Sequence, residues 1–297
     1  MSTDPQQYDF AEFLTQPSFL RSSFSSQQSE GTGISLWDSA YTPATTPPTS
    51  DRRVEIRSIS DVTTTLDLQS PITLSFTKGS KLFKLKYSKL VVCKDSLGAV
   101  RCIELSDPAS LSGAFIHTFT NMKKPIPHLE QPSTSTHKSL RVCFLEDQNV
   151  QIAQTVFNTQ PQYTFEKGSD CDKFQEAVLG VAVLFVAGVA DIASKGRGEE
   201  AISQNLRVCR STTGRLSLLF FANSQRKERK RYISLPVDSF DSVEPPKKNG
   251  KPVQFKLAAD SELSAQMKAL SILFIDNNDA KRICTLMQAA GVKISGR

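Results

Sequence analysis

Hydrophobic and polar positions follow three patterns along the chain. From about residue 70, runs of branched and aromatic residues alternate partly with polar ones, as in Lys81–Tyr87 and Val100–Leu105, which is typical of half-buried β-strands. Two later stretches, starting near Cys171 and Ala280, place apolar residues on one helical face. Residues 1–66 show neither period and are dominated by Ser, Thr, Gln and Pro. Such a segment buries too little apolar surface to order itself, so we expect a disordered tail there.

Polar turns divide the β-rich part into further elements. The pattern predicts strands over Leu140–Leu145, Val150–Phe157, Tyr163–Phe165, Leu216–Ala222, Tyr232–Leu235 and Leu270–Ile275. The first helix is expected to begin with a capping box of Ser169 and Asp172, and the second with Asp276 as its cap. Ala177–Ala190 is apolar throughout but shorter than the roughly 20 residues that span a membrane. We therefore predict a buried helix there, with Gly196–Gly198 as a linker behind it.

Two blocks of sequence occur twice in the same order. At an offset of 116 residues, the first block matches Leu90, Val92, Cys93, Lys94 and Gly98 with Leu206, Val208, Cys209, Arg210 and Gly214. At an offset of 109, the second matches Phe165, Asp170, Lys173, Phe174 and Val178 with Phe274, Asp279, Arg282, Ile283 and Met287. Each copy opens with a hairpin and closes with an amphipathic helix, which indicates a duplication. Chance similarity between two β-rich segments is the alternative.

A unit of several antiparallel strands and one closing helix resembles a pleckstrin-homology-like domain. The whole chain, with its Ser/Thr/Pro-rich start, is similar to fungal-type tandem pleckstrin-homology-like proteins. The resemblance implies a mainly β, α+β fold of two bent antiparallel barrels over 67–194 and 195–297, each plugged by its C-terminal helix through Phe174 or Ile283. It also implies a non-enzymatic scaffold that recognises other proteins. A tryptophan expected in the closing helix is absent, since Trp37 in the tail is the only one.

Charge is unevenly distributed along the chain. The formal net charge is +6, yet residues 1–50 hold one basic and five acidic residues, so an acidic tail precedes a basic body. The candidate anion-binding or lipid-binding residues are Arg226, Lys227, Arg229, Lys230 and Arg231, with Lys247, Lys248 and Lys251 as an extension. Such a cluster attracts anionic membrane surfaces, resembles a nuclear-localisation signal, or is a solvated edge that prevents aggregation.

Lipid-binding members of the family carry basic residues at the end of the first strand and alternating in the second. Lys94 and Arg210 suit the first position, but Ile103 and Ser217 stand where the second strand needs another cation after Arg101 and Arg215. The lysine row Lys78, Lys81, Lys84, Lys86 and Lys89 is predicted to be an exposed face. This departure favours protein partners over a specific headgroup.

Signals for catalysis are weak. The three histidines, His117, His128 and His137, fall in one stretch that we predict to be weakly structured. No CxxC pair, P-loop or nucleophile elbow occurs. We therefore expect no catalytic residues, no metal and no cofactor. We also expect reduced cysteines, a cytoplasmic location, no transmembrane segment, and no nucleic-acid partner because the basic run lacks interleaved aromatic residues.

Overall fold

The computed structural model describes residues 62–107, 113–119, 125–130, 132, 140–146, 148–196, 198–224, 231–259, 261 and 267–295. The predicted tail lies outside this part of the chain except for its last five residues. Those residues form strand β1 (Val62–Leu66), which pairs with β4 (Lys89–Lys94) along its whole length. The ordered body therefore begins at least five residues earlier than the composition indicates.

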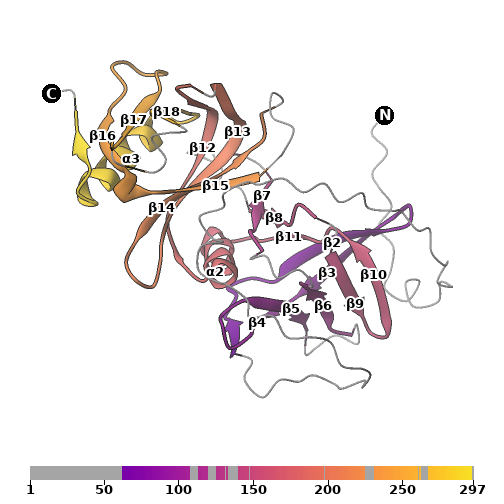
Figure 1. The fold of residues 1–297 in the computed structure, drawn as a ribbon. Helices are drawn as coiled ribbons and strands as arrows, with labels where there is room; N and C mark the ends of the chain where they lie inside the picture. Colours follow the sequence, from indigo (N-terminus) through magenta and orange to yellow (C-terminus); the bar gives the residue numbers. More distant parts are fainter. Residues whose placement is uncertain are drawn as a thin grey trace, which may run out of the picture.

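The first half of the described chain forms two antiparallel sheets (Figure 1). The six-stranded sheet runs β1-β4-β5-β6-β9-β10, in which the new strands are β5 (Val100–Ser106), β6 (Phe115–Thr118), β9 (Gln148–Ile152) and β10 (Thr155–Thr159). The five-stranded sheet runs β3-β2-β11-β8-β7, made of β2 (Ile72–Lys78), β3 (Lys81–Tyr87), β7 (His128–Leu129), β8 (Arg141–Cys143) and β11 (Gln162–Thr164). Apolar residues of both sheets share one buried core.

Helix α2 (Gly168–Leu179) closes this core. Phe174 is fully buried, and its ring lies 5.1 Å from that of Tyr163 and 5.3 Å from that of Phe165. The predicted capping box is wrong, because Lys167 is the N-cap and makes no side-chain cap bond. Buried Asp170 instead accepts a hydrogen bond of 2.9 Å from the Gln69 backbone N–H, which ties the helix to the segment after β1.

The second half forms a single eight-stranded sheet in the order β15-β14-β13-β12-β18-β17-β16-β19. Its strands are β12 (Ala182–Ser194), β13 (Gly198–Arg210), β14 (Leu216–Ala222), β15 (Arg231–Pro236), β16 (Phe240–Glu244), β17 (Val253–Leu257), β18 (Ala269–Phe274) and β19 (Lys293–Ile294), with a 3-10 turn η2 (Val237–Ser239). Helix α3 (Asn277–Ala289) buries Ile283 and Met287 in the core of this half. The Asp276 carboxylate accepts a hydrogen bond from the Asn278 N–H, so its predicted role as the cap is confirmed.

The prediction of two equivalent pleckstrin-homology-like barrels is wrong. The first half is divided between two sheets, because Ser88 separates β3 from β4 and residues 67–71 separate β1 from β2. The second half is one open sheet, whose edge strands β15 and β19 do not pair with each other in the described residues. Two closing helices do exist, but they cover differently built sheets.

The predicted buried helix over Ala177–Ala190 is also wrong. Helix α2 ends at Leu179, where Gly180 adopts a left-handed conformation with φ of 67° and its N–H binds the Glu176 carbonyl. The following residues, rich in valine, form strand β12, which pairs directly with β13, so the predicted linker lies between two paired strands, with Arg197 outside the described residues. Because β12 lies in the eight-stranded sheet, the first residue of that sheet precedes the predicted domain boundary at 194/195.

The two hairpins that the sequence matches have turns of the same geometry. In the first, β4–β5, Asp95 N–H binds Ala99 O and Gly98 N–H binds Asp95 O, both at 2.9 Å. In the second, β13–β14, Ser211 N–H binds Arg215 O at 2.9 Å and Gly214 N–H binds Ser211 O at 3.0 Å. Both glycines have positive φ, 79° and 85°. The duplication itself stays a prediction, but the two turns share the same backbone hydrogen bonds and a glycine with positive φ at the same position.

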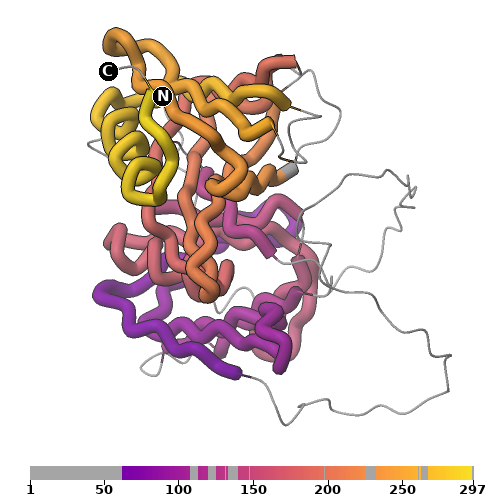
Figure 2. The backbone as a smooth tube through the Cα atoms, turned by 60° about the vertical axis from the view of Figure 1, so that its left-hand side comes forward, coloured from indigo at the N-terminus to yellow at the C-terminus, as the bar shows by residue number. Residues whose placement is uncertain are grey.

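A buried arginine joins the two halves, which lie against each other in Figures 1 and 2. Arg207 of β13 is only 1% exposed. It donates hydrogen bonds to Gln175 Oε1 of α2 at 2.8 Å and to the Pro127 carbonyl at 2.6 Å. Leu179, Cys209 and Leu219 form a small apolar cluster at the same contact. A buried guanidinium needs such acceptors, so the two halves are packed against one another at a specific site.

Candidate functional site

A basic groove runs between helix α3 and the loop that connects β16 to β17. Its volume is about 570 Å³, and its rim carries Lys247 and Lys248 from the loop and Lys281 from α3. All three lysines are exposed. Ala280 and Cys284 of α3 and Ile294 of β19 add apolar surface to the lining. The groove therefore combines three lysines with a lining that is partly apolar and partly polar, because Asn249, Asn277, Thr285 and Gln288 also contribute to it.

Local sequence explains why this groove has a fixed shape. Pro245 and Pro246 end β16, because proline lacks the N–H that a continuing ladder would use. The loop then turns at Gly250, where φ is 74°, and its N–H donates a hydrogen bond of 2.9 Å to Asn277 Oδ1 at the start of α3. That bond holds the loop beside the helix, so Lys247 and Lys248 lie opposite Lys281.

Two ion pairs near the groove, Lys256–Glu244 and Arg282–Asp279, partly neutralise the charges of their members. Lys256 pairs with Glu244, and the Lys256 hydrogen bond, followed by its charge, lowers the pKa of the Glu244 carboxyl. Arg282 binds Asp279 at 2.6 Å and lies 5.0 Å from the centre of the Phe185 ring, on the other side of α3. A shallower hollow of about 450 Å³ lies there, beside Leu184 and Phe185. Lys281 and Thr285 border both hollows.

The predicted anion-binding run lies mostly outside the described residues. Arg226, Lys227, Arg229 and Lys230 are not described, and Arg231 is described only as the first backbone position of β15. Arg231 pairs with Ala222 of β14, so the run connects two paired strands, as predicted. Just before the run, the Asn223 side chain accepts a hydrogen bond from the Ile202 N–H and donates one to the Ile202 carbonyl. The Ser224 N–H donates to the Glu200 carbonyl. Asn223 and Ser224 therefore lie beside β13, whereas Lys247 and Lys248 lie beside α3.

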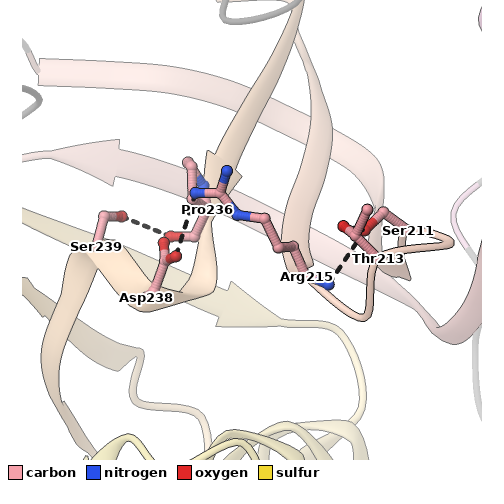
Figure 3. Close-up of polar contacts among 6 residues, drawn as sticks. All are labelled: Ser211, Thr213, Arg215, Pro236, Asp238 and Ser239. Atoms are coloured by element: carbon pink, nitrogen blue, oxygen red, sulfur yellow. Dashed lines mark hydrogen bonds and ion pairs between the residues drawn. The ribbon is translucent and has the colours of Figure 1, made fainter.

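The other predicted basic positions are dispersed. Arg215 forms an exposed ion pair of 3.3 Å with Asp238, and its N–H binds Ser211 Oγ (Figure 3). Lys94 is half-buried, and burial lowers the pKa of its ammonium. In the lysine row predicted to be exposed, Lys84, Lys86 and Lys89 are exposed, whereas Lys78 and Lys81 are half-buried. No described element brings Lys94 and Arg215 into one phosphate-binding cluster.

Two of the histidines are not in weakly structured segments. His117 lies fully buried on β6 and shares a hydrogen bond of 2.7 Å with the Tyr163 hydroxyl, and burial lowers its pKa to about 3. His128 on β7 shares a hydrogen bond of 2.9 Å with the Tyr232 hydroxyl at the contact between the halves. Burial, and then the Arg207 charge, lower its pKa to about 4, while burial raises the pKa of Tyr232 to about 12. His137 lies outside the described residues.

The sequence indicates only part of this groove. Lys247 and Lys248 are predicted as an extension of the Arg226–Arg231 run, and Lys281 is not predicted because only the folded loop brings α3 close to them. Within the described residues no helix is both long and apolar enough to span a bilayer. No known protein-family model matches the chain, and no relative is found among curated proteins.

Proposed function

We propose that this protein is a non-enzymatic binding scaffold that recognises an acidic segment of a partner protein in the groove beside α3. The observation that carries the proposal is the convergence of Lys247, Lys248 and Lys281 around an interior lined partly by Ala280, Cys284 and Ile294. Cations at a rim steer and orient carboxylates, while apolar contacts in the interior supply affinity. We place this activity in the cytoplasm, with the acidic tail as a second, regulatable contact.

The mixed lining supports a peptide over a small metabolite. Each of the two hollows beside α3 combines apolar residues with at least one lysine, and Lys281 belongs to both. An extended peptide can place carboxylates near the lysines and apolar side chains over Ala280 and Ile294. A compact anion would use only the lysines and gain nothing from the apolar lining.

A direct test is fluorescence anisotropy with two labelled peptides on the full chain. One is a twelve-residue peptide rich in Glu and Leu, and the other replaces every Glu by Gln. The proposal expects the acidic peptide to bind more tightly and its affinity to fall with rising salt. The triple variant K247E/K248E/K281E should weaken binding at least about tenfold, because each reversal turns an attraction into a repulsion.

The matched control is K84E/K86E/K89E, which reverses three exposed lysines on β3 and β4. This control changes the net charge by the same amount at a distant surface. Its binding should equal that of the wild type. Equal losses in both triple variants would mean that the peptide responds to net charge rather than to the groove, and would refute the proposal.

A second candidate function is attachment to anionic membranes through Arg226–Arg231. The pairing of Ala222 with Arg231 supports it, because the run then belongs to the connection between two paired strands rather than to a strand itself. Sedimentation with vesicles containing anionic lipid tests it. Reversal of Arg226, Lys227, Arg229, Lys230 and Arg231 should abolish co-sedimentation, whereas reversal of the groove lysines should not. The same run would act in the nucleus if it serves as an import signal.

A further inference from the structure

The outer face of the β4–β5 hairpin brings two thiols and a carboxylate together. Cys93 on β4 is directly opposite Cys102 on β5, and Glu104 is two residues further along the same strand. Residues two apart on a strand share a face, so all three side chains lie on one side of the sheet. Their ligand atoms, two Sγ and one carboxylate oxygen, lie within 4.8 Å of one another.

We propose that Cys93, Cys102 and Glu104 form a binding site for a zinc ion. Zinc takes thiolate and carboxylate ligands in a tetrahedron, with bonds of about 2.3 Å to sulfur and about 2.0–2.2 Å to oxygen. Those bonds place a sulfur and an oxygen ligand about 3.5 Å apart and two sulfurs about 3.8 Å apart. Cys102 Sγ and Glu104 Oε1 are already 3.9 Å apart, so small side-chain rotations complete the geometry.

The exposure of the three proposed ligands increases from Cys93 through Cys102 to Glu104, as expected for a zinc site that is open to solvent on one side. Cys93 is 8% exposed, Cys102 is half-buried and Glu104 is exposed. The thiols therefore lie toward the protein and the carboxylate toward solvent, which leaves room for water as a fourth ligand. No disulfide joins any cysteines in the described residues. On binding, each thiol releases its proton to solvent, and no oxidant or reductant is needed.

The corresponding hairpin in the second half lacks these ligands. Cys209 of β13 is opposite Ser217 of β14, and Leu219 is the next residue on that face. Cys209 and Leu219 are buried in the contact between the halves. Motifs based on sequence spacing also miss the site, because Cys93 and Cys102 are brought together by cross-strand pairing rather than by a CxxC turn. The site belongs to the first half alone and is independent of the groove beside α3.

The test uses the reduced full chain loaded with zinc and desalted, with bound metal measured by elemental analysis. Cobalt loading gives a second readout, because a thiolate–cobalt bond produces an intense charge-transfer absorption. One metal equivalent and that absorption are expected for the wild type. C102S should weaken binding at least about a hundredfold, since losing a ligand costs more than losing a second-shell partner. E104Q should weaken it at least about tenfold, because the neutral amide oxygen is a poorer zinc ligand than the carboxylate.

C143S and E166Q are the matched controls, because Cys143 is half-buried like Cys102 and Glu166 is exposed like Glu104. Both controls should bind zinc as the wild type does. C93S changes a buried position, so its circular dichroism is compared with that of the wild type to check that it folds. If C93S does not fold, the zinc binding of C102S alone tests the proposal. Absence of metal in the reduced wild type, full binding by C102S, or a cobalt spectrum without a thiolate band would each overturn the proposal.

Discussion

The two matched hairpins have similar turns but present different outer faces. On the β13–β14 hairpin the outer positions hold Arg207, Cys209 and Leu219, and all three are buried against the first half. On the β4–β5 hairpin the positions that correspond by register hold Val91, Cys93 and Glu104. Val91 offers no donors to a partner, and Glu104 is exposed. One hairpin therefore serves as a docking face, while the other leaves Val91 half-buried and Glu104 exposed.

Hydrogen bonds from long polar side chains distinguish the docking face of the β13–β14 hairpin from the outer face of β4–β5. Arg207 reaches acceptors on two segments of the first half, and Asn205 adds a hydrogen bond of 3.2 Å to the Leu129 carbonyl. Tyr232 and His128 extend the same contact from β15 and β7. A side chain with several donors can satisfy backbone carbonyls that would otherwise be buried without partners. A short apolar side chain such as Val91 cannot.

The largest effect is expected from the closing helices. Phe174→Ala removes a fully buried ring between Tyr163 and Phe165, and should lower the free energy of unfolding by about 3–5 kcal/mol. Ile283→Ala should cost about 2–5 kcal/mol in the second half for the same reason. Urea unfolding of both variants measures this. A loss below about 1 kcal/mol in either would show that its helix does not close a packed core.

The docking face should be more sensitive than its counterpart. Arg207→Met fills similar volume but leaves Gln175 and the Pro127 carbonyl without their buried donor, and should cost about 2–3 kcal/mol. Val91→Met on the β4–β5 hairpin, where Val91 is half-buried, should cost less than about 1 kcal/mol. Urea unfolding gives both values. If the two variants were equally stable, the hydrogen bonds of Arg207 would not be what makes the β13–β14 hairpin, rather than the β4–β5 hairpin, a docking face.

Acid should destabilise the protein through buried His117 and half-buried His128. The pKa values of His117 and His128 are lowered to about 3 and about 4, below the usual 6.5. The unfolded chain therefore binds protons below about pH 6.5 that the folded chain rejects, so stability falls as pH decreases. Between pH 7 and 5 the loss should be about 2 kcal/mol for His117. It should be about 1 kcal/mol for His128, which solvent partly reaches.

Thermal or urea unfolding of H117Q and H128Q at both pH values checks this assignment. Each variant should show a smaller difference between pH 7 and pH 5 than the wild type, and H117Q should show the larger reduction. An unchanged pH dependence in H117Q would contradict the burial of a neutral imidazole in the first core.

The smallest expected effect tests the shared turn. Gly98 and Gly214 both have positive φ, and a Cβ at either position would meet no atom within 4 Å. An alanine there costs only backbone strain, which is about 1 kcal/mol. Gly98→Ala and Gly214→Ala should therefore destabilise the chain equally in urea unfolding. A difference above about 1 kcal/mol would show that the two turns are not equivalent.

Local patterns predicted the elements better than their assembly. The hairpin turns and the buried stripes of α2 and α3 follow from glycine placement and helical period, which short windows reveal. The grouping of strands into three sheets does not, because it depends on interruptions such as Ser88 and on long-range pairing. The helix prediction for residues 182–190 is wrong because a short apolar run suits either a buried helix or a buried strand.

The candidate sites were harder to predict for the same reason. Lys281 joins Lys247 only after the loop folds onto α3, and His128 meets Tyr232 across 104 residues of sequence. Such contacts leave no spacing motif in the chain. The basic run Arg226–Arg231 can be recognised in the sequence because its charges are close together in the chain, whereas the groove lysines come from separate elements.

Protection of Cys284 tests most directly whether partners bind in the groove. Its thiol lines the groove and is half-buried, while Cys102 lies on the other half of the molecule. Alkylation rates of both cysteines, followed by peptide mass spectrometry, are compared with and without the acidic peptide. The account predicts slower alkylation of Cys284 and an unchanged rate at Cys102. Peptide binding at full affinity without any protection of Cys284 would contradict it.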